Sequence, residues 1–424
     1  MKILLVVHQY PPFNMGGTEV YTRNLAAELH RCGCDVVLYF RADFNGRPFA
    51  TCDETIDGVR ARRVSAPLVG WRSLPLIEFY RTFLNPAIER DFAAFLTREQ
   101  PDVVHFQHVM ALSARLIPIA RRMGFPVVLT LHDYWFLCSN SQLIWPDAQV
   151  CRGKALGLNC ARCALAARAR TSLMQPLRPI AVPLLQVRDA LVRQAGLKAN
   201  LLIAPSHFLI QQYVKAGFPA DRFVYLENGI DVERIRRYPH RPPVDGRVRF
   251  TYLGSLAWQK GVHVAVEAFR GIPADKAVLR IYGDPTVFPE YTAHLHQLAD
   301  PTNTFFEGVV PNEEVGRVLA ETDVVVVPSL WYENSPVVIQ EAFAAGVPVV
   351  ASQLGALIEK VQDGCGVLCA PGDVGAWHKT LLSTIDRVVQ AEAPFDNPPE
   401  VMTIERQAAL LEQIYKDIQS NRPG

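Results

Sequence analysis

The sequence lacks any run of 18 or more apolar residues, which is what a membrane-spanning helix requires. It also lacks a strong charge of either sign: the net charge of the 424 residues is +1, which gives no reason to expect a nucleic-acid partner. The apolar part of the first residues is too short for a secretory signal, and the nine cysteines are an odd number. We therefore expect a cytoplasmic protein without a disulfide framework.

Two further absences limit the classes of protein to which the chain can belong. No internal repeat is present, and the G-x-G-x-x-G fingerprint of dinucleotide-binding proteins is missing, so a dehydrogenase is not expected. What is present is a chain with 49% apolar residues, in which short β-branched runs alternate with amphipathic stretches. This alternation predicts α/β domains with parallel sheets, and the length predicts two or three of them.

The stretch from Val324 to Val350 shows this pattern most clearly. Four consecutive valines predict a strand that is buried on both faces of a parallel sheet. Ser335 suits the N-cap of the helix that follows, and Pro336 suits its first position. Gly346 is expected to end this helix, and a second buried strand completes the stretch.

Two carboxylates, Glu333 and Glu341, flank the start of this predicted helix. Glu333 lies in the turn before the helix, and Glu341 lies about two turns into it. Both are expected near the carboxyl ends of the strands, where open α/β sheets bind their ligands. The alternative is an ordinary strand–helix connection, because glutamates are common near helix starts for dipole reasons.

One segment in each half of the chain lies just before a predicted helix and suits the binding of an anion. Gly16 and Gly17 come before a helix that Thr18 can cap, and glycines let backbone amides approach an anion closely. A plain turn is the alternative there. In the second half, Lys260 stands just before a helix, where a cation is disfavoured by roughly 0.3–1 kcal/mol unless an anion binds. Lys260 therefore predicts a phosphate site.

Four of the nine cysteines lie within 26 residues: Cys138, Cys151, Cys160 and Cys163. The pattern C-x12-C-x8-C-x2-C suits a tetrahedral structural Zn²⁺ site in a cytosolic protein. A redox pair, an iron–sulfur cluster or separate buried thiols are the alternatives. The H-x-x-H pair of His105 and His108 has no third ligand nearby and is interpreted as cleft lining.

A basic segment spans residues 151–200, with nine lysines or arginines and one acidic residue, Asp189. It predicts either helices with a solvated basic face or a surface that docks to an anionic membrane or a polyanionic acceptor.

The motif from Glu333-Asn334-Ser335-Pro336 to Glu341-Ala342 resembles the E-x7-E signature of the retaining glycosyltransferases of family 4, also called glycosyl transferases group 1. Segments 16–19, 130–133, 228–231 and 254–261 are similar to further motifs of this family. The resemblance covers nearly the whole chain outside the cysteine-rich insert and the aromatic helices predicted within residues 71–97.

The resemblance implies the GT-B fold, with two Rossmann-like, doubly wound parallel-sheet domains facing a central cleft. The expected domains are residues 1–228, on the acceptor side and with the cysteine-rich insert at about 138–163, and residues 229–400, on the donor side. Residues 401–424 are expected to form a helix that crosses back to the first domain.

The resemblance also implies roles for single residues. The expected donor-binding residues are Gly16, Gly17, Gly254, Ser255, Lys260, Asn334, Ser335 and Glu341. Glu341 would hold the donor ribose, Glu333 would hold the sugar hydroxyls, and Lys260 would stabilise the departing diphosphate. His132 corresponds to a histidine that faces the donor sugar, where an imidazole can hydrogen-bond a hydroxyl or carry partial positive charge. A histidine satisfied by a neighbouring backbone group is the alternative.

The expected activity is transfer of a sugar from a nucleotide-diphosphate sugar to a glycan or lipid-linked acceptor, with retention at the anomeric carbon. No catalytic metal is expected, because the Asp-x-Asp motif of metal-dependent GT-A enzymes is absent. Ser255 departs from the family pattern, which has an arginine there, and so leaves the diphosphate one charge short. The alternatives are a sugar-nucleotide-binding protein without activity and a GT-B epimerase. The expected location is the cytoplasm. If the basic segment docks to a membrane, the protein is expected at the inner face of the cell membrane.

Overall fold

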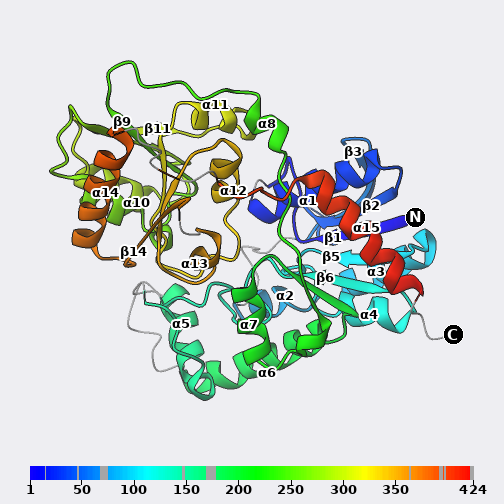
Figure 1. The fold of residues 1–424 in the computed structure, drawn as a ribbon. Helices are drawn as coiled ribbons and strands as arrows, with labels where there is room; N and C mark the ends of the chain where they lie inside the picture. Colours follow the sequence, from blue (N-terminus) through cyan, green and yellow to red (C-terminus); the bar gives the residue numbers. More distant parts are fainter. Residues whose placement is uncertain are drawn as a thin grey trace. The chain divides into compact units, whose positions relative to one another are not determined.

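The computed structural model describes residues 1–14, 16–44, 47–66, 75–145, 149–168, 178–361, 364–390, 395 and 398–420. The chain forms two compact α/β units, and Figure 1 labels many of their elements. Unit 1 comprises Met1–Gln142, Arg152–Gly229 and Ile404–Gly424, and unit 2 comprises Leu143–Cys151 and Ile230–Thr403. Leu143–Cys151 was expected within the first domain but belongs to unit 2.

Unit 1 is built on an eight-stranded sheet with the order β3-β4-β2-β1-β5-β6-β7-β8. The strands are β1 (Lys2–Val7), β2 (Asp35–Arg41), β3 (Thr51–Ile56), β4 (Val59–Val64), β5 (Val103–Phe106), β6 (Val127–Thr130), β7 (Leu201–Ala204) and β8 (Phe223–Tyr225). All neighbours are parallel except β3 and β4. Its helices are α1 (Gly17–Arg31), α2 (Pro75–Arg81), α3 (Pro86–Glu99), α4 (Leu116–Arg122), α5 (Leu158–Arg168), α6 (Arg178–Gly196), α7 (His207–Lys215) and α15 (Ile404–Ser420). The last helix, α15, packs beside α1 (Figure 1).

Unit 2 is built on a six-stranded, fully parallel sheet with the order β11-β10-β9-β12-β13-β14. The strands are β9 (Val248–Leu253), β10 (Ala277–Tyr282), β11 (Thr304–Gly308), β12 (Val324–Val327), β13 (Val349–Ser352) and β14 (Gly366–Cys369). The helices are α8 (Val232–Arg236), α9 (Val262–Phe269), α10 (Pro289–Leu298), α11 (Val315–Ala320), α12 (Val337–Ala344), α13 (Leu357–Lys360) and α14 (Val374–Val389).

The four valines of β12 show why this sheet is doubly wound. Val324 and Val326 pack into a core shared with α9 and α14, whereas Val325 and Val327 pack into a separate core shared with α11 and α12. Successive side chains of a strand point to opposite faces, so a strand covered on both faces needs an apolar residue at every position. The prediction for this stretch is confirmed.

Some elements were not evident from the sequence. The hairpin of β3 and β4 is one of these elements. Its outer strand β3 is largely polar and is held by ion pairs such as Arg62–Asp53 and Arg63–Glu54, so its sequence carries little apolar alternation. The described part of the stretch 71–97 is largely helical as predicted, and it forms the two helices α2 and α3 because Asn85 caps a new helix at Pro86. The long helix α14 was not predicted.

A search of the described helices finds none with both the length and the apolar character to span a bilayer.

Candidate functional site

Two loops meet at the carboxyl ends of the neighbouring strands β9 and β12 in unit 2. The loop after β9 runs from Gly254 to Gly261, and the loop after β12 runs from Pro328 to Pro336. The Leu330 amide donates a hydrogen bond of 2.9 Å to the carbonyl of Gln259 in the first loop. Gly261 has a φ of +68°, and a Cβ atom there would overlap the carbonyl oxygen of Pro328. Only glycine therefore allows this close approach.

Glu333 is held at the centre of these loops. Its Oε1 accepts hydrogen bonds from Lys260 Nζ at 2.8 Å, Ser329 Oγ at 2.7 Å and Trp331 Nε1 at 2.8 Å. The Lys260 ammonium also lies 5.2 Å from the centroid of the Trp331 ring. Glu333 is buried and the Lys260 side chain is partly exposed. The sequence predicted both as site residues, and the structure brings them together in one ion pair.

Glu341 lies deeper, on α12, and forms an ion pair with Arg234 of α8. Arg234 also donates to the carbonyl of Asn312, and Asp231 caps its helix. Burial raises the pKa of Glu341, while the Arg234 guanidinium opposes this shift. Within the described ranges, Arg234 is the one side chain that bonds Glu341. The sequence analysis did not predict this partner.

Ser335 does not cap α12 as expected. The helix begins at Val337 with Pro336 at its N-cap, and no side chain caps it. Ser335 Oγ has no hydrogen-bond partner among the described residues. Asn334 is buried beside it. In the loop after β9, Ser255 and Gly254 are exposed, and the Ser255 carbonyl accepts a hydrogen bond of 2.8 Å from Tyr252. The donor-binding roles of these four residues stay predictions.

In unit 1, Gly16 is the N-cap of α1 and Gly17 is its first residue, so the expected Thr18 cap is wrong. Glu19 folds back over Gly16, and its Oε1 lies 3.2 Å from His8 Nε2. Burial raises the pKa of Glu19 and lowers that of His8, which the neighbouring His108 lowers further. The two glycines therefore start a helix whose first turn carries a buried carboxyl group.

His132 follows β6 and lies against two other side chains of unit 1. Its Nε2 is 2.8 Å from Gln107 Oε1, and its ring centroid is 5.0 Å from that of Tyr21. Burial lowers the pKa of His132 to about 3, with a further lowering from His108 and an opposing effect of Asp133. The imidazole is therefore neutral at physiological pH, which favours a hydrogen-bonding role over a cationic one.

The four clustered cysteines, which the sequence predicts to hold zinc, are divided between the two units of the chain. Cys138 Sγ donates to Asn140 Oδ1 at 3.2 Å, and Asn140 Nδ2 donates to Cys163 Sγ at 3.4 Å. Cys160 lies on α5, and Cys151 belongs to unit 2. Among the residues that the structure describes, no group of three or more histidine, cysteine or carboxylate side chains is placed to hold a metal ion. Zinc stays a prediction of the sequence.

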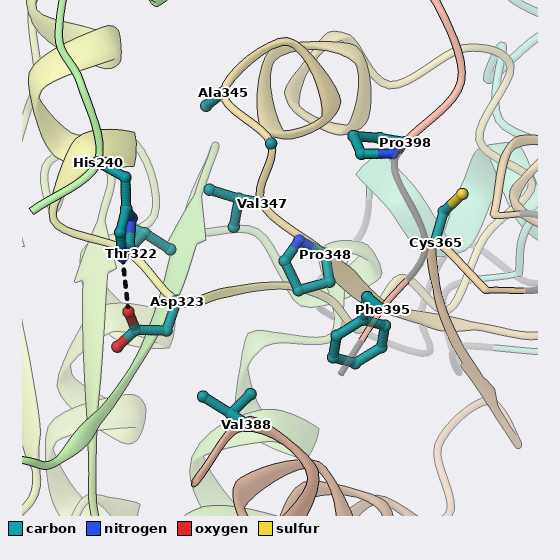
Figure 2. A pocket seen from close by; sticks show the side chains of 11 residues that line it. His240, Thr322, Asp323, Ala345, Val347, Pro348, Cys365, Val388, Phe395 and Pro398 are labelled. Carbon is teal, nitrogen blue, oxygen red and sulfur yellow. Dashed lines mark ion pairs between the residues drawn. The ribbon is translucent and has the colours of Figure 1, made fainter. Parts of the chain in front are cut away.

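The two edges of the unit 2 sheet carry different pockets. A pocket of about 280 Å³ lies at the amino edge. His240 faces Asp323 in it, and the remaining lining is mostly apolar (Figure 2). Asp323 is neutralised there by a bidentate bond from Arg249. A pocket of about 570 Å³ lies at the carboxyl edge, lined by His263, Leu330, Leu354, Pro371 and others. This second pocket adjoins the Lys260 loops through Leu330, so the carboxyl edge is the candidate site.

Parts of the basic segment have structural partners. Arg188 is buried, donates to the carbonyl of Trp135 at 2.8 Å and pairs with Asp189, which also pairs with Lys154. Large apolar side chains are exposed nearby, among them Leu156 and Ile180. The expected docking surface stays a prediction.

The pairing of Arg234 with Glu341 leads to a pH-dependent prediction. We expect Arg234→Leu to lower the free energy of unfolding by about 3–5 kcal/mol near neutral pH, because Glu341 is left as an unpaired buried carboxylate. The pKa of Glu341 in the folded state then rises further above its unfolded value. The folded state takes up the proton as pH falls, so the deficit shrinks toward about pH 5. Denaturant unfolding across this range measures it.

The double variant Arg234→Leu/Glu341→Gln is the control, because it has no carboxylate to protonate. Its stability relative to the wild type is expected to change little with pH. A deficit of the single variant that stays constant with pH would contradict the prediction.

The close approach at Gly261 gives a second prediction. We expect Gly261→Ala to destabilise unit 2 by clearly more than the ~1 kcal/mol cost of a strained φ, since the new methyl group must displace the Pro328 loop. Gly246→Ala is the matched control, because Gly246 also has a positive φ of +73° but open space around its Cβ position. Thermal unfolding of both variants checks this, and equal losses would disprove the interlocking of the loops.

Comparison with known proteins gives the same fold and identifies the family. Residues 15–234 match the model of Glycosyltransferase Family 4, and residues 247–387 match that of Glycosyl transferases group 1. Glycogen synthase of Mycobacterium tuberculosis is 26% identical over 409 residues, which cover 92% of this chain and 88% of that protein.

Two solved structures are similar over almost their whole length. Sucrose-phosphate synthase from Thermosynechococcus elongatus has a TM-score of 0.71 at 19% identity and covers 99% of both chains. Anabaena HepE in complex with UDP and glucose has a TM-score of 0.60 at 17% identity, with 99% of this chain and 97% of that chain covered. These likenesses confirm the GT-B fold. The chain is a GT-B glycosyltransferase and belongs to glycosyltransferase family 4.

Proposed function

We propose that the protein transfers a sugar from a nucleotide-diphosphate sugar to a glycan or lipid-linked acceptor, with retention of the anomeric configuration. The observation that carries the proposal is the placement of Lys260 and Glu333 in two interlocked loops at the carboxyl ends of β9 and β12. Ligands of open α/β sheets bind at this edge. Membership of the family supports sugar transfer as the class of reaction. The positions of Lys260 and Glu333 support the carboxyl edge of the unit 2 sheet as the donor site.

In this proposal, the donor diphosphate replaces Glu333 as the partner of Lys260. The phosphates lie at the N-terminus of α9, where backbone amides and the helix dipole favour negative charge. Glu333, released from Lys260 but still bonded to Ser329 and Trp331, accepts hydrogen bonds from the sugar hydroxyls. The exposed backbone of Gly254 and Ser255 borders the phosphates.

The remaining predicted residues complete the donor site. Glu341 accepts hydrogen bonds from the ribose hydroxyls while Arg234 keeps its carboxylate in place. The backbone amides of Asn334 and Ser335 face the sugar. In unit 1, the neutral His132 hydrogen-bonds a sugar hydroxyl, and the amides of Gly16 and Gly17 approach the diphosphate.

The reaction breaks the bond between the anomeric carbon and the diphosphate oxygen, and the bonding electrons leave with the diphosphate. The acceptor hydroxyl attacks from the same face, and its proton passes to the departing phosphate oxygen. The protein's task is to stabilise the charge that develops on the leaving group, which preorganised cations and amides do. Lys260 and the start of α9 perform this task, and no nucleophilic carboxylate and no metal ion enter the proposal.

A UDP-sugar is the first donor to test, because HepE, a structural neighbour, was solved with UDP and with UDP-glucose. For the acceptor, the exposed apolar residues of unit 1, together with basic residues such as Arg152 and Arg162, suit contact with an anionic membrane surface from the cytoplasmic side. A lipid-linked acceptor would be presented there.

The second candidate function is sugar-nucleotide binding without transfer, which Ser255 favours because it leaves the diphosphate with fewer cations than the family pattern supplies. Calorimetric titration with UDP-, GDP- and ADP-sugars, followed by product analysis with glycan and lipid-linked acceptors, separates the two functions. Donor binding without turnover would favour the binding protein. Conversion of the donor alone to an epimer would favour an epimerase.

Removal of the Lys260 charge tests the donor site. We expect Lys260→Gln to lower the rate of sugar transfer, measured as nucleoside diphosphate formed, by roughly 10²–10³-fold. The reason is that one preorganised charge that stabilises the leaving group is lost. We expect Glu341→Ala to weaken donor binding in calorimetry instead, since the ribose is bound equally in the ground and transition states. Lys198→Gln removes an exposed lysine of unit 1 and should leave both quantities unchanged. Full activity of Lys260→Gln would refute the assignment.

A further inference from the structure

A chain of buried polar groups leads from the carboxyl-terminal helix α15 to His132, all within unit 1. Tyr415 of α15 places its hydroxyl 2.6 Å from Nδ1 of His105, and Nε2 of His105 lies 2.7 Å from Thr130 Oγ1. Gln107 is two residues further along and places its Nε2 3.3 Å from either ring nitrogen of His105. The other end of the same amide, Oε1, lies 2.8 Å from His132 Nε2.

The chemistry of these groups determines the protonation state of His132. A carbonyl oxygen only accepts hydrogen bonds, so Nε2 of His132 must be the protonated nitrogen. Because the ring is neutral, Nδ1 then carries the lone pair. Gln107 thus selects one tautomer, provided that its amide stays in this orientation. Its backbone amide is fixed to β1 by a hydrogen bond of 2.8 Å to the Val6 carbonyl.

A second connection reaches His132 from the same helix. Gln407 of α15 shares a side-chain hydrogen bond with the Tyr21 hydroxyl, and the ring of Tyr21 packs against His132. Gln407 also donates to the carbonyl of Glu227 at 2.8 Å and accepts from the Gly229 amide at 2.9 Å. These are the last residues of unit 1 before the chain enters unit 2.

We propose that α15 positions the His132 imidazole, with Gln107 as the residue that fixes its tautomer. Tyr415 and Gln407 are the residues of α15 that act in this way, the first through His105 and the second through Tyr21. The catalytic meaning of this arrangement rests on the proposed function, in which His132 faces the donor sugar. There, the tautomer decides which ring nitrogen can donate a hydrogen bond and which can accept one.

Packing alone does not account for these contacts. Tyr415, His105 and Gln107 are fully buried, and apolar residues of similar volume would fill the same space without the cost of removing polar groups from water. Buried polar networks of this kind define one arrangement of the side chains when each member is bonded. The network ends at His132, the histidine that the sequence motif identifies. The bonded arrangement of the buried side chains therefore defines the hydrogen bonding of the His132 ring.

The test measures the tautomer directly and needs no substrate. The protein is labelled with ¹⁵N-histidine, and long-range proton–nitrogen NMR spectra report the protonated nitrogen of each of the 11 histidines. The signals of His132 are assigned by their loss in His132→Gln. We expect the Nε2–H form in the wild type, with no titration between about pH 5.5 and 8, because the pKa of His132 is about 3.

Three variants then separate positioning from folding. Gln107→Glu places a carboxylate beside His132, so the pKa of His132 should rise and the ring should charge as pH falls toward 5.5. The other titratable groups that interact with the ring are His8, His105, His108 and Asp133. Gln107→Met should give a mixture of tautomers. Tyr415→Phe, which removes only a hydroxyl, should shift the His132 signals in the same direction as Gln107→Met, by less.

Tyr39→Phe is the matched control, because Tyr39 is also fully buried in unit 1 but bonds Asp91 on α3. It should leave the His132 signals unchanged. An Nδ1–H form in the wild type, or His132 signals that Gln107→Met and Tyr415→Phe leave unchanged in folded protein, would overturn the proposal. Because no donor is added, failure of this test is distinguishable from failure of the proposed transfer reaction.

Discussion

The alignment of β9 with β12 is the constraint on which the candidate donor site depends. Asp323, just before β12, accepts from the Arg249 amide at 2.8 Å and from the Arg249 guanidinium through both oxygens, so the amino ends of the two strands are tied. Between these ends, the valines of β12 pack on both faces of the sheet. The carboxyl ends of β9 and β12 must then lie side by side. The loops that carry Lys260 and Glu333 follow these ends and interlock there. The geometry of the site is set at the opposite edge of the sheet.

The parts of the fold that were predicted correctly are those in which one local pattern outweighs all others. The valine run of β12 needs no knowledge of distant residues. The hairpin of β3 and β4 depends instead on arginine–carboxylate pairs between strands, which an apolar pattern does not reveal. Ser335 is a good N-cap by residue type, but α12 starts one residue later than predicted, with Pro336 at its N-cap.

The candidate site also contains both residues that the sequence identified and residues that it did not. The sequence identified Lys260, Glu333, Glu341 and His132, since each lies in a recognisable motif at the end of a strand or at or within the helix that follows it. It did not identify the residues that hold them: Arg234, Trp331, Gln107 and Tyr415. These come from other elements, and Tyr415 is 283 positions from His132 in the chain. Arg234 left a weak signal, as a cation close after the Asn228–Asp231 segment, but its partner is defined only by the packing of α8 on α12.

The placement of α15 in unit 1 has a consequence for biosynthesis. Unit 1 is interrupted in sequence by almost the whole of unit 2, and its last helix is translated only after unit 2 is complete. During synthesis the sheet of unit 1 emerges first, while His105 and Tyr21 still lack their partners on α15. Domains usually fold in the order in which they leave the ribosome, but here unit 1 lacks its helix α15 until the residues of unit 2 have been translated. A nascent chain is thus structurally incomplete around His132 until its final helix has docked.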